Sequence, residues 1–152
     1  MYEFLQETVE DNMTRNVRSV TPETTVGDLY RLFAADGFDA YPVVRGDALI
    51  GVVSKLDALK VFGLSQDHIL PRYAEGMATT VDEIMTSDVV TVDAESKLQR
   101  VLELLLKHRV KSVPVVDGGR NLIGIIARED VMRAMERATL RRYPPVVPFE
   151  TA

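Results

Sequence analysis

The sequence contains no cysteine, and that absence removes several chemistries at once. Disulfide bonds, thiolate metal sites and cysteine nucleophiles are all excluded. The two histidines, His68 and His108, lie far apart and lack the spacing of metal ligands, so we expect no metal site. The chain also lacks a P-loop, a GxSxG motif and a GxGxxG motif. We therefore expect a protein that is not an enzyme, with no catalytic residues and no required cofactor.

Positive charge and long apolar runs are also scarce. The 152 residues include 18 lysines and arginines against 23 acidic residues, which gives a net charge of −5. Such a chain lacks the positive field that attracts a phosphate backbone, so nucleic acid is not an expected partner. The longest apolar runs, such as residues 104–106, are too short to span a bilayer, and the acidic start MYEFLQETVED does not resemble a signal peptide. We expect a cytoplasmic protein that does not bind membranes.

What the sequence does contain is an internal repeat. An offset of 72 residues aligns Met13-Thr14 with Met85-Thr86, and one extra residue near Arg120 then raises the offset to 73. Of the 50 positions from 13 to 62, 14 are identical in the two copies. Self-similarity of this kind indicates two copies of one structural unit. The expected segments are a first repeat (9–62), a linker (63–80), a second repeat (81–138) and a proline-rich tail (139–152).

Each copy has the same order of secondary-structure signals. A short strand is expected first, near 17–20 and 89–92, and an amphipathic helix with apolar residues at i, i+3, i+4 and i+7 follows. Thr25 with Asp28, and Ser96 with Gln99, have the spacing of a capping box at the start of that helix. Two β-rich runs and a second helix complete the copy. The order β-α-β-β-α predicts an α/β (α+β) fold in which the tandem repeats pack with pseudo-two-fold symmetry. The expected strands are 41–44, 49–54, 113–116 and 122–127, and the expected second helices are 55–62 and 128–138.

These motifs together resemble the cystathionine-β-synthase (CBS) domain pair, or Bateman module, in its stand-alone form. The resemblance rests on VEDNMT and VDEIMT, on YPVV and VPVV, and on GVVSKLD (51–57) and GIIARED (124–130). It covers about residues 9–138. It implies a regulatory module with two equivalent clefts between the repeats, which in this family often hold AMP, ADP, ATP or S-adenosylmethionine. It also implies a homodimer formed through the helices.

The motif from Ser54 to Asp57 lies where a strand ends and a helix begins. Backbone N–H groups and the positive end of the helix dipole make that junction a ready anion site. Asp57 would accept hydrogen bonds from a ribose diol, and Ser54 would donate to ribose or phosphate. The same Ser-x-x-Asp spacing is also an ordinary helix cap, so both interpretations remain open. The resemblance implies a stronger cleft formed by Ser54, Asp57, Thr86, Val90, Val110, Lys111 and Ser112, with Val110 against the adenine and Lys111 toward the phosphate.

The symmetry-related cleft is chemically different. Ala127 replaces Ser54 there, and Asp39 replaces Lys111, which puts negative charge where a phosphate would lie. We expect this cleft to be the weaker of the two and to be empty or to prefer a nucleoside without phosphate. The resemblance implies that its residues are Thr14, Arg18, Phe38, Asp39, Arg128 and Asp130.

Two functional hypotheses follow from these features. The first is a regulatory module that binds an adenine nucleotide and acts on an unidentified protein. The second is a structural or interaction protein that keeps the fold but has lost ligand binding. In both, a homodimer is expected, because the second helices carry apolar residues at matched positions. These residues are Ala58, Leu59 and Phe62 in the first repeat and Val131, Met132 and Met135 in the second.

Overall fold

The computed structural model describes residues 2–63 and 73–142. His68, Pro71 and the tail beyond Arg142 lie outside the described residues. The chain divides into two compact units that are interleaved in sequence and do not follow the repeat boundaries. Within the described part, the first-repeat unit comprises 18–63, 73–89 and 120–122, and the second-repeat unit comprises 2–17, 90–119 and 123–142.

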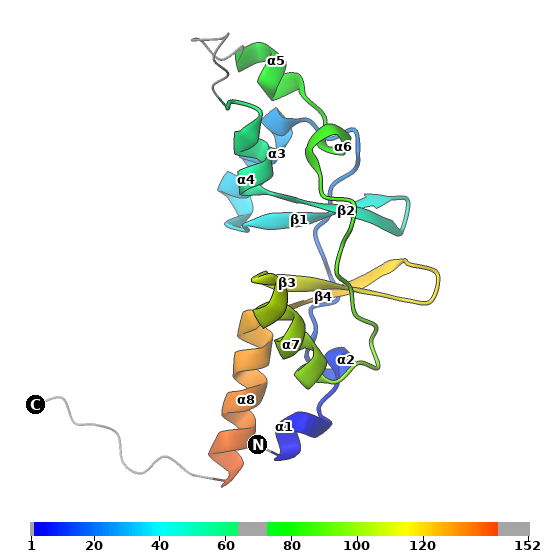
Figure 1. Cartoon of the computed structure of the whole chain (residues 1–152), viewed down its shortest axis with the longest axis vertical. Coiled ribbons are helices and arrows are strands. Elements are labelled where there is room, and N and C mark those ends of the chain that lie inside the picture. The colour runs from blue at the N-terminus through cyan, green and yellow to red at the C-terminus, as the bar shows by residue number, and fades with distance from the viewer. Residues whose placement is uncertain (1, 64–72, 143–152) are drawn as a thin grey trace, which may run out of the picture. The chain divides into compact units, whose positions relative to one another are not determined.

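The first-repeat unit is built on a β-hairpin with helices on one side (Figure 1). The two strands pair antiparallel through a two-residue turn, in which Gly46 has a φ of 61°. The helix before them buries Val26, Leu29 and Phe33, as the apolar spacing predicts. Thr25 caps it by accepting the Asp28 N–H at 3.2 Å, and Gly37 ends it in the left-handed conformation. The elements are α3 (Val26–Asp36), β1 (Ala40–Arg45), β2 (Ala48–Ser54), α4 (Lys55–Lys60), α5 (Tyr73–Ala78) and α6 (Val81–Ile84).

The opening residues of the second repeat complete the core of this unit. Val81 is fully buried in the same apolar cluster as Val26 and Leu29. The linker segment around Gly76 is also part of the unit, because α5 packs on α3 and Gly76 makes room for the ring of Phe62. The sequence therefore continues to build the first-repeat unit well beyond the end of the first repeat.

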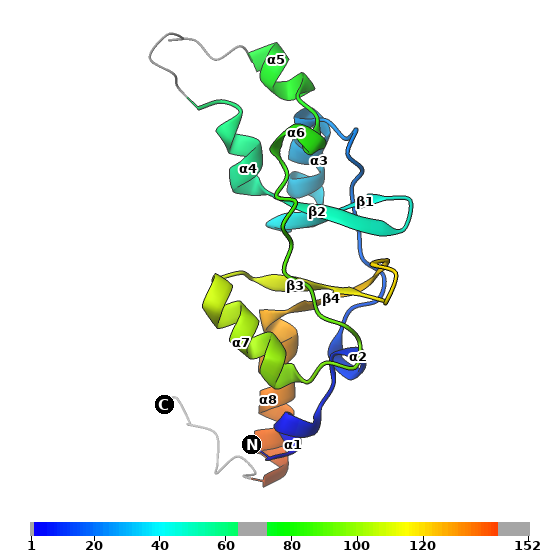
Figure 2. The ribbon, with the colours of Figure 1, turned by 45° about the vertical axis from the view of Figure 1, so that its right-hand side comes forward.

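The second-repeat unit has the same arrangement of a β-hairpin and helices. In it, the N-terminal residues 2–17 take the place that residues 73–89 have in the first-repeat unit. Phe4 and Val9 are buried against Leu98 and Ile126. Figures 1 and 2 both show the N-terminal helices beside the last helix, and the Arg137 guanidinium lies 3.5 Å from the Glu7 carboxylate there. The elements are α1 (Tyr2–Gln6), α2 (Val9–Asn12), α7 (Leu98–His108), β3 (Ser112–Val116), β4 (Leu122–Ala127) and α8 (Arg128–Arg142).

Some local expectations are wrong. The N-cap residue of α7 is Lys97, so Ser96 lies one residue too early to cap the helix, and its hydroxyl donates to Asp93 at 2.8 Å. The expected short strands are reduced to single parallel bridges, which join Val20 to Val43 and Val92 to Val115. The last helix continues past Ala138 to Arg142.

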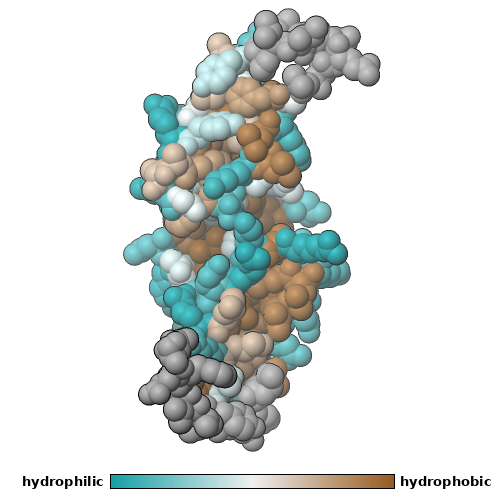
Figure 3. Space-filling model, turned by 90° about the vertical axis from the view of Figure 1, so that its left-hand side faces the viewer, coloured by the Kyte–Doolittle hydropathy of each residue, from teal (hydrophilic) through white to brown (hydrophobic). Residues whose placement is uncertain are grey.

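Apolar side chains reach the surface in both units, as the brown areas of Figure 3 show. Leu59 of α4 is 54% exposed and Met132 of α8 is 68% exposed. Ala58 and Val131 were also expected in a dimer contact, but they are buried in the cores of their own units. Among the helices of the described residues, none is long and apolar enough to cross a bilayer.

Candidate functional site

The junction of β2 and α4 holds the first pair of predicted ligand residues. Ser54 and Asp57 form a capping box: the Ser54 N–H donates to the Asp57 carboxylate at 2.9 Å, and the Asp57 N–H donates to the Ser54 hydroxyl at 3.1 Å. The other carboxylate oxygen of Asp57 lies 3.7 Å from the Lys60 ammonium. The structure thus gives Asp57 a capping role, with 13% of its side chain still exposed.

The equivalent junction of β4 and α8 has only half of this arrangement. Asp130 accepts the Ala127 N–H at 2.8 Å, but alanine has no hydroxyl to accept the Asp130 N–H in turn. The second oxygen of Asp130 is bound by Arg133, and only 6% of the side chain is exposed. Asp130 is therefore more enclosed than Asp57, and its free accepting capacity is smaller.

The two predicted threonines are fixed by backbone pairing. Thr86 and Val52 exchange hydrogen bonds of 2.9 Å in both directions, and Thr14 and Ile125 do the same in the other unit. A glycine next to Val52 allows this close approach, since a Cβ at Gly51 would lie 2.9 Å from the Thr86 carbonyl oxygen. The threonine positions are thus set by the sheet rather than by their own side chains.

The connection between α3 and β1 carries Phe38 and Asp39. Half of the Phe38 surface is exposed, and its ring packs edge-on against Tyr41 with centroids 5.8 Å apart. The Asp39 carbonyl accepts the Lys55 N–H at 2.9 Å, and the Asp39 carboxylate lies 3.7 Å from the Lys55 ammonium. This connection is therefore held against the start of α4.

The matching connection between α7 and β3 carries positive charge. The Lys111 carbonyl accepts the Arg128 N–H at 3.0 Å, which is the same backbone link as in the first-repeat unit. Arg109 occupies the position of Gly37 and has a φ of 53°, a left-handed conformation that is costly for any residue with a Cβ. Val110 packs on the apolar core of the unit.

Arg18 is engaged in a polar network that the sequence did not reveal. Its guanidinium lies 2.8 and 3.0 Å from the two carboxylate oxygens of Asp36, and the buried Tyr41 hydroxyl donates to the same carboxylate at 2.7 Å. The Tyr41 hydrogen bond, with help from Arg18, holds the pKa of Asp36 below its ordinary value. Burial, reinforced by Asp36, raises the pKa of Tyr41. The sequence did contain one indication of this network. Asp36 lies in the last turn of a helix, where the helix dipole disfavours an acidic residue, so a cationic or hydrogen-bonding partner could have been expected.

The candidate residues fall into two groups, one on each unit. Within each group the structure fixes the residues relative to one another. The pairing of the groups into two complete clefts stays a prediction. The first-repeat unit carries Arg18, Phe38, Asp39, Ser54, Asp57 and Thr86, and the second-repeat unit carries Thr14, Val90, Val110, Lys111, Ser112, Arg128 and Asp130.

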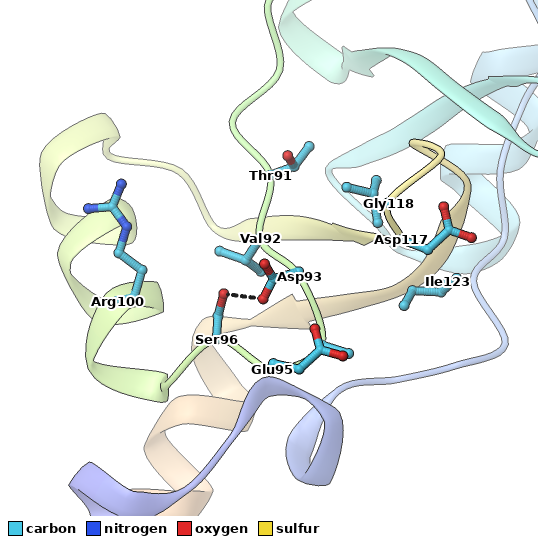
Figure 4. A pocket seen from close by; sticks show the side chains of 11 residues that line it. Thr91, Val92, Asp93, Glu95, Ser96, Arg100, Asp117, Gly118 and Ile123 are labelled. Carbon is cyan, nitrogen blue, oxygen red and sulfur yellow. Dashed lines mark hydrogen bonds between the residues drawn. The ribbon is translucent and has the colours of Figure 1, made fainter.

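A depression of about 500 Å³ lies elsewhere on the second-repeat unit (Figure 4). It is bounded by the segment before α7 and by the turn after β3, and its rim carries Asp93, Glu95 and Asp117 with Arg100 at one side. No predicted ligand residue lines it. Across residues 2–63 and 73–142, no three histidine or acidic side chains are grouped so that they could hold a metal ion.

Comparison with known proteins identifies the repeat. A family model described as the CBS domain matches residues 7–63 and again residues 81–137. The protein MJ1225 of Methanocaldococcus jannaschii is 30% identical over 132 residues, covering 84% of this chain and 46% of that protein. Its crystal structure gives a TM-score of 0.78 at 29% identity, over 86% of this chain and 48% of that one. This chain therefore spans about half of that relative.

Two further relatives differ in how much of their length is shared. The inosine-5'-monophosphate dehydrogenase of Korarchaeum cryptofilum is 30% identical over 122 residues, which is 80% of this chain but 23% of the enzyme. The structure of CBSX2 in complex with AMP gives a TM-score of 0.74 at 30% identity, over 87% of this chain and 98% of that one. CBSX2 is a CBS-pair protein from Arabidopsis thaliana. With both repeats matched and the β-hairpin and helices repeated in each unit, this chain belongs to the CBS domain family.

Proposed function

We propose that this chain is a cytoplasmic regulatory module that binds an adenine nucleotide and acts on another protein, without catalysing a reaction itself. The observation that carries the proposal is its match to nearly the whole of CBSX2, whose structure was solved with AMP. The match to the dehydrogenase covers only 23% of that enzyme, so the activity of the enzyme is no part of the proposal. AMP is accordingly the first ligand to test, followed by ADP, ATP and S-adenosylmethionine.

The capping role of Asp57 is compatible with ribose binding. A carboxylate has two oxygens and about four lone-pair positions, and the Ser54 N–H uses one of them. The remaining positions can accept the two hydroxyls of a ribose diol. Asp130 also binds Arg133 and is less exposed, so Asp57 is the better ribose acceptor.

The phosphate would be bound by the basic connection after α7. Lys107 lies in the last turn of α7, and Arg109 and Lys111 follow it at alternate positions in the connection. Cations near the C-terminal end of a helix are favoured even without a ligand, so their presence alone does not require a phosphate. The left-handed Arg109 is the stronger support, because strained backbone of this kind tends to occur at functional sites.

Thermal unfolding in the presence of nucleotides tests the proposal. A ligand that binds only the folded state stabilises it by about 2.7 kcal/mol when its concentration is 100 times its Kd. We expect AMP to raise the melting temperature in a concentration-dependent manner, and GMP at the same concentrations to have a much smaller effect. No change with any of the four adenine ligands at millimolar concentration would contradict the proposal.

One observation favours the alternative that ligand binding has been lost. Both Asp57 and Asp130 already serve as helix caps, and capping alone accounts for an acidic residue at the third position of a helix. The alternative predicts that Asp57→Ala lowers the melting temperature while no adenine ligand raises it. The same thermal measurement therefore separates the two functions.

We also propose that the chain forms a homodimer through α4 and α8. Leu56 and Leu59 of α4 are 63% and 54% exposed, and Met132 of α8 is 68% exposed. Leaving such side chains in water forgoes the free energy of burying them, about 1.5–3 kcal/mol for each when fully buried. An isologous contact between two copies would bury the same residues twice.

A further inference from the structure

The two helix-capping aspartates hold one carboxylate oxygen in the same way. Asp57 Oδ2 accepts the Ser54 N–H at 2.9 Å, and Asp130 Oδ2 accepts the Ala127 N–H at 2.8 Å. In each unit this oxygen is thus bonded to the backbone at the start of the helix, which uses one of its two accepting positions. A ribose diol that donates to both oxygens of the carboxylate therefore needs Oδ1 as well.

Oδ1 is where the two carboxylates differ. Each aspartate is followed three residues later by a cation, a spacing that brings side chains together on one face of a helix. In the first-repeat unit, the Lys60 ammonium lies 3.7 Å from Asp57 Oδ1, which is too long for a hydrogen bond. In the second-repeat unit, the Arg133 guanidinium donates a hydrogen bond to Asp130 Oδ1. Arg133 therefore bonds the oxygen that Lys60, at the same position, does not.

The chemistry of the two cations accounts for this difference, since their side chains are about equally exposed, 67% for Lys60 and 64% for Arg133. Arginine presents a planar fork of N–H donors that matches a carboxylate, whereas the lysine ammonium is flexible and strongly hydrated. The bond from Arg133 is charge-assisted, and such bonds are about twice as strong as neutral ones. A ribose hydroxyl would have to displace Arg133 before it could donate to Asp130 Oδ1.

We propose that Arg133 is a specificity-determining residue, which occupies Asp130 Oδ1 and so prevents this aspartate from accepting a ribose diol. Each chain then binds one adenosine-type ligand, at Asp57, although the repeat supplies two equivalent aspartates. The residue three positions after each aspartate decides which of them is used. The inference rests on the proposed nucleotide-binding function.

Exchanging the two cations tests the proposal, with adenosine as the probe and calorimetry as the measurement. Adenosine carries the ribose diol but no phosphate, so its affinity does not depend on the basic connection after α7. In an Asp57→Ala background we expect weak adenosine binding, and adding Arg133→Lys should tighten it by about tenfold, the effect of one charge-assisted hydrogen bond. The reciprocal change, Lys60→Arg in the otherwise wild-type chain, should weaken adenosine binding by a similar factor.

Matched variants separate ligand selection from folding. Arg137→Lys makes the same exchange one turn later on α8, at an arginine that lies 3.5 Å from the Glu7 carboxylate, and should leave adenosine affinity unchanged. Adding Asp130→Ala should cancel the gain from Arg133→Lys, because the gain acts through that carboxylate. If Arg133→Lys does not fold, Arg133→Gln removes the same charge-assisted bond and carries the same expectation.

The outcomes distinguish this inference from the proposed function. Adenosine affinity that is unchanged in Arg133→Lys or in Lys60→Arg, or a gain that persists after Asp130→Ala, would overturn the role of Arg133 while leaving nucleotide binding at Asp57 intact. A wild-type protein that binds neither AMP nor adenosine would instead show that the proposed function itself is wrong.

Discussion

The hydroxyl of Tyr41 donates a 2.7 Å hydrogen bond to the carboxylate of Asp36, across the junction of α3 and β1. Because this bond and Arg18 lower the folded-state pKa of Asp36, the carboxylate adds stability at pH values above its unfolded pKa of about 4. That stability is lost as the pH falls through the folded-state pKa. We expect Asp36→Asn to be less stable than the wild type at neutral pH and to approach it on acidification. Urea unfolding at a series of pH values measures the difference, and a gap that is independent of pH would contradict the pairing.

Gly51→Ala should destabilise the protein, because the new Cβ would lie 2.7 Å from the Met85 sulfur and 2.9 Å from the Thr86 carbonyl oxygen. Overpacking of this kind costs about 1–3 kcal/mol, and here it also pushes Thr86 out of its pairing with β2. Urea unfolding measures the loss. Gly118→Ala is the matched control, since a Cβ there meets no atom within 4 Å. Equal stability of the two variants would show that the close approach at Gly51 is unimportant.

Arg109→Gly should stabilise the folded chain. The φ of 53° at Arg109 is unfavourable for a residue with a Cβ, and glycine removes a cost of about 1 kcal/mol. Arg100→Gly, in the first turn of α7, should have the opposite effect, because glycine at a helical position costs up to about 1 kcal/mol. Chemical denaturation of both variants checks the sign. A loss of stability in Arg109→Gly would mean that the side chain contributes more to the fold than its backbone strain costs.

The internal repeat was sufficient to predict most of the architecture. Because the two copies align residue by residue, the apolar spacing in one supports the same assignment in the other. The structure has α3 and α7 before the hairpins, in the order expected, and both hairpins appear near the expected bounds. The interleaving of the units was not predictable in this way. The contacts of Phe4 and Val81 join segments far apart in sequence, and no local pattern encodes them.

The candidate site was predictable in its residue types but not in its contacts. The sequence indicated a cap at Ser54 and Asp57, and the structure confirms the cap. The pairing of Arg18 with Asp36 was missed, since the two residues lie on different elements and only the fold brings them together. The expected Ser96 cap failed because α7 begins one residue later than the spacing predicts, with Lys97 at the N-cap position.

Leu59→Glu should weaken self-association. The wild-type protein is expected to be a homodimer at tens of micromolar, and a charge placed in an apolar contact must be desolvated without a partner. Light scattering over a dilution series measures the mass. Leu106→Glu, which alters an exposed residue of α7, is the control and should remain dimeric. A monomeric wild-type protein would contradict the proposed interface.

The AMP affinity of Asp57→Ala, measured by calorimetry, tests the nucleotide-binding function most directly. Glu83→Ala is the matched control, because Glu83 also caps a helix at its third position in the same unit but belongs to no candidate site. If Asp57 accepts a ribose diol, Asp57→Ala should weaken AMP binding by about 1.5–3 kcal/mol, and Glu83→Ala should leave it unchanged. Asp130→Ala should have a smaller effect than Asp57→Ala. AMP binding of equal strength in the wild type and Asp57→Ala would show that Asp57 is a helix cap alone and would contradict the ribose assignment.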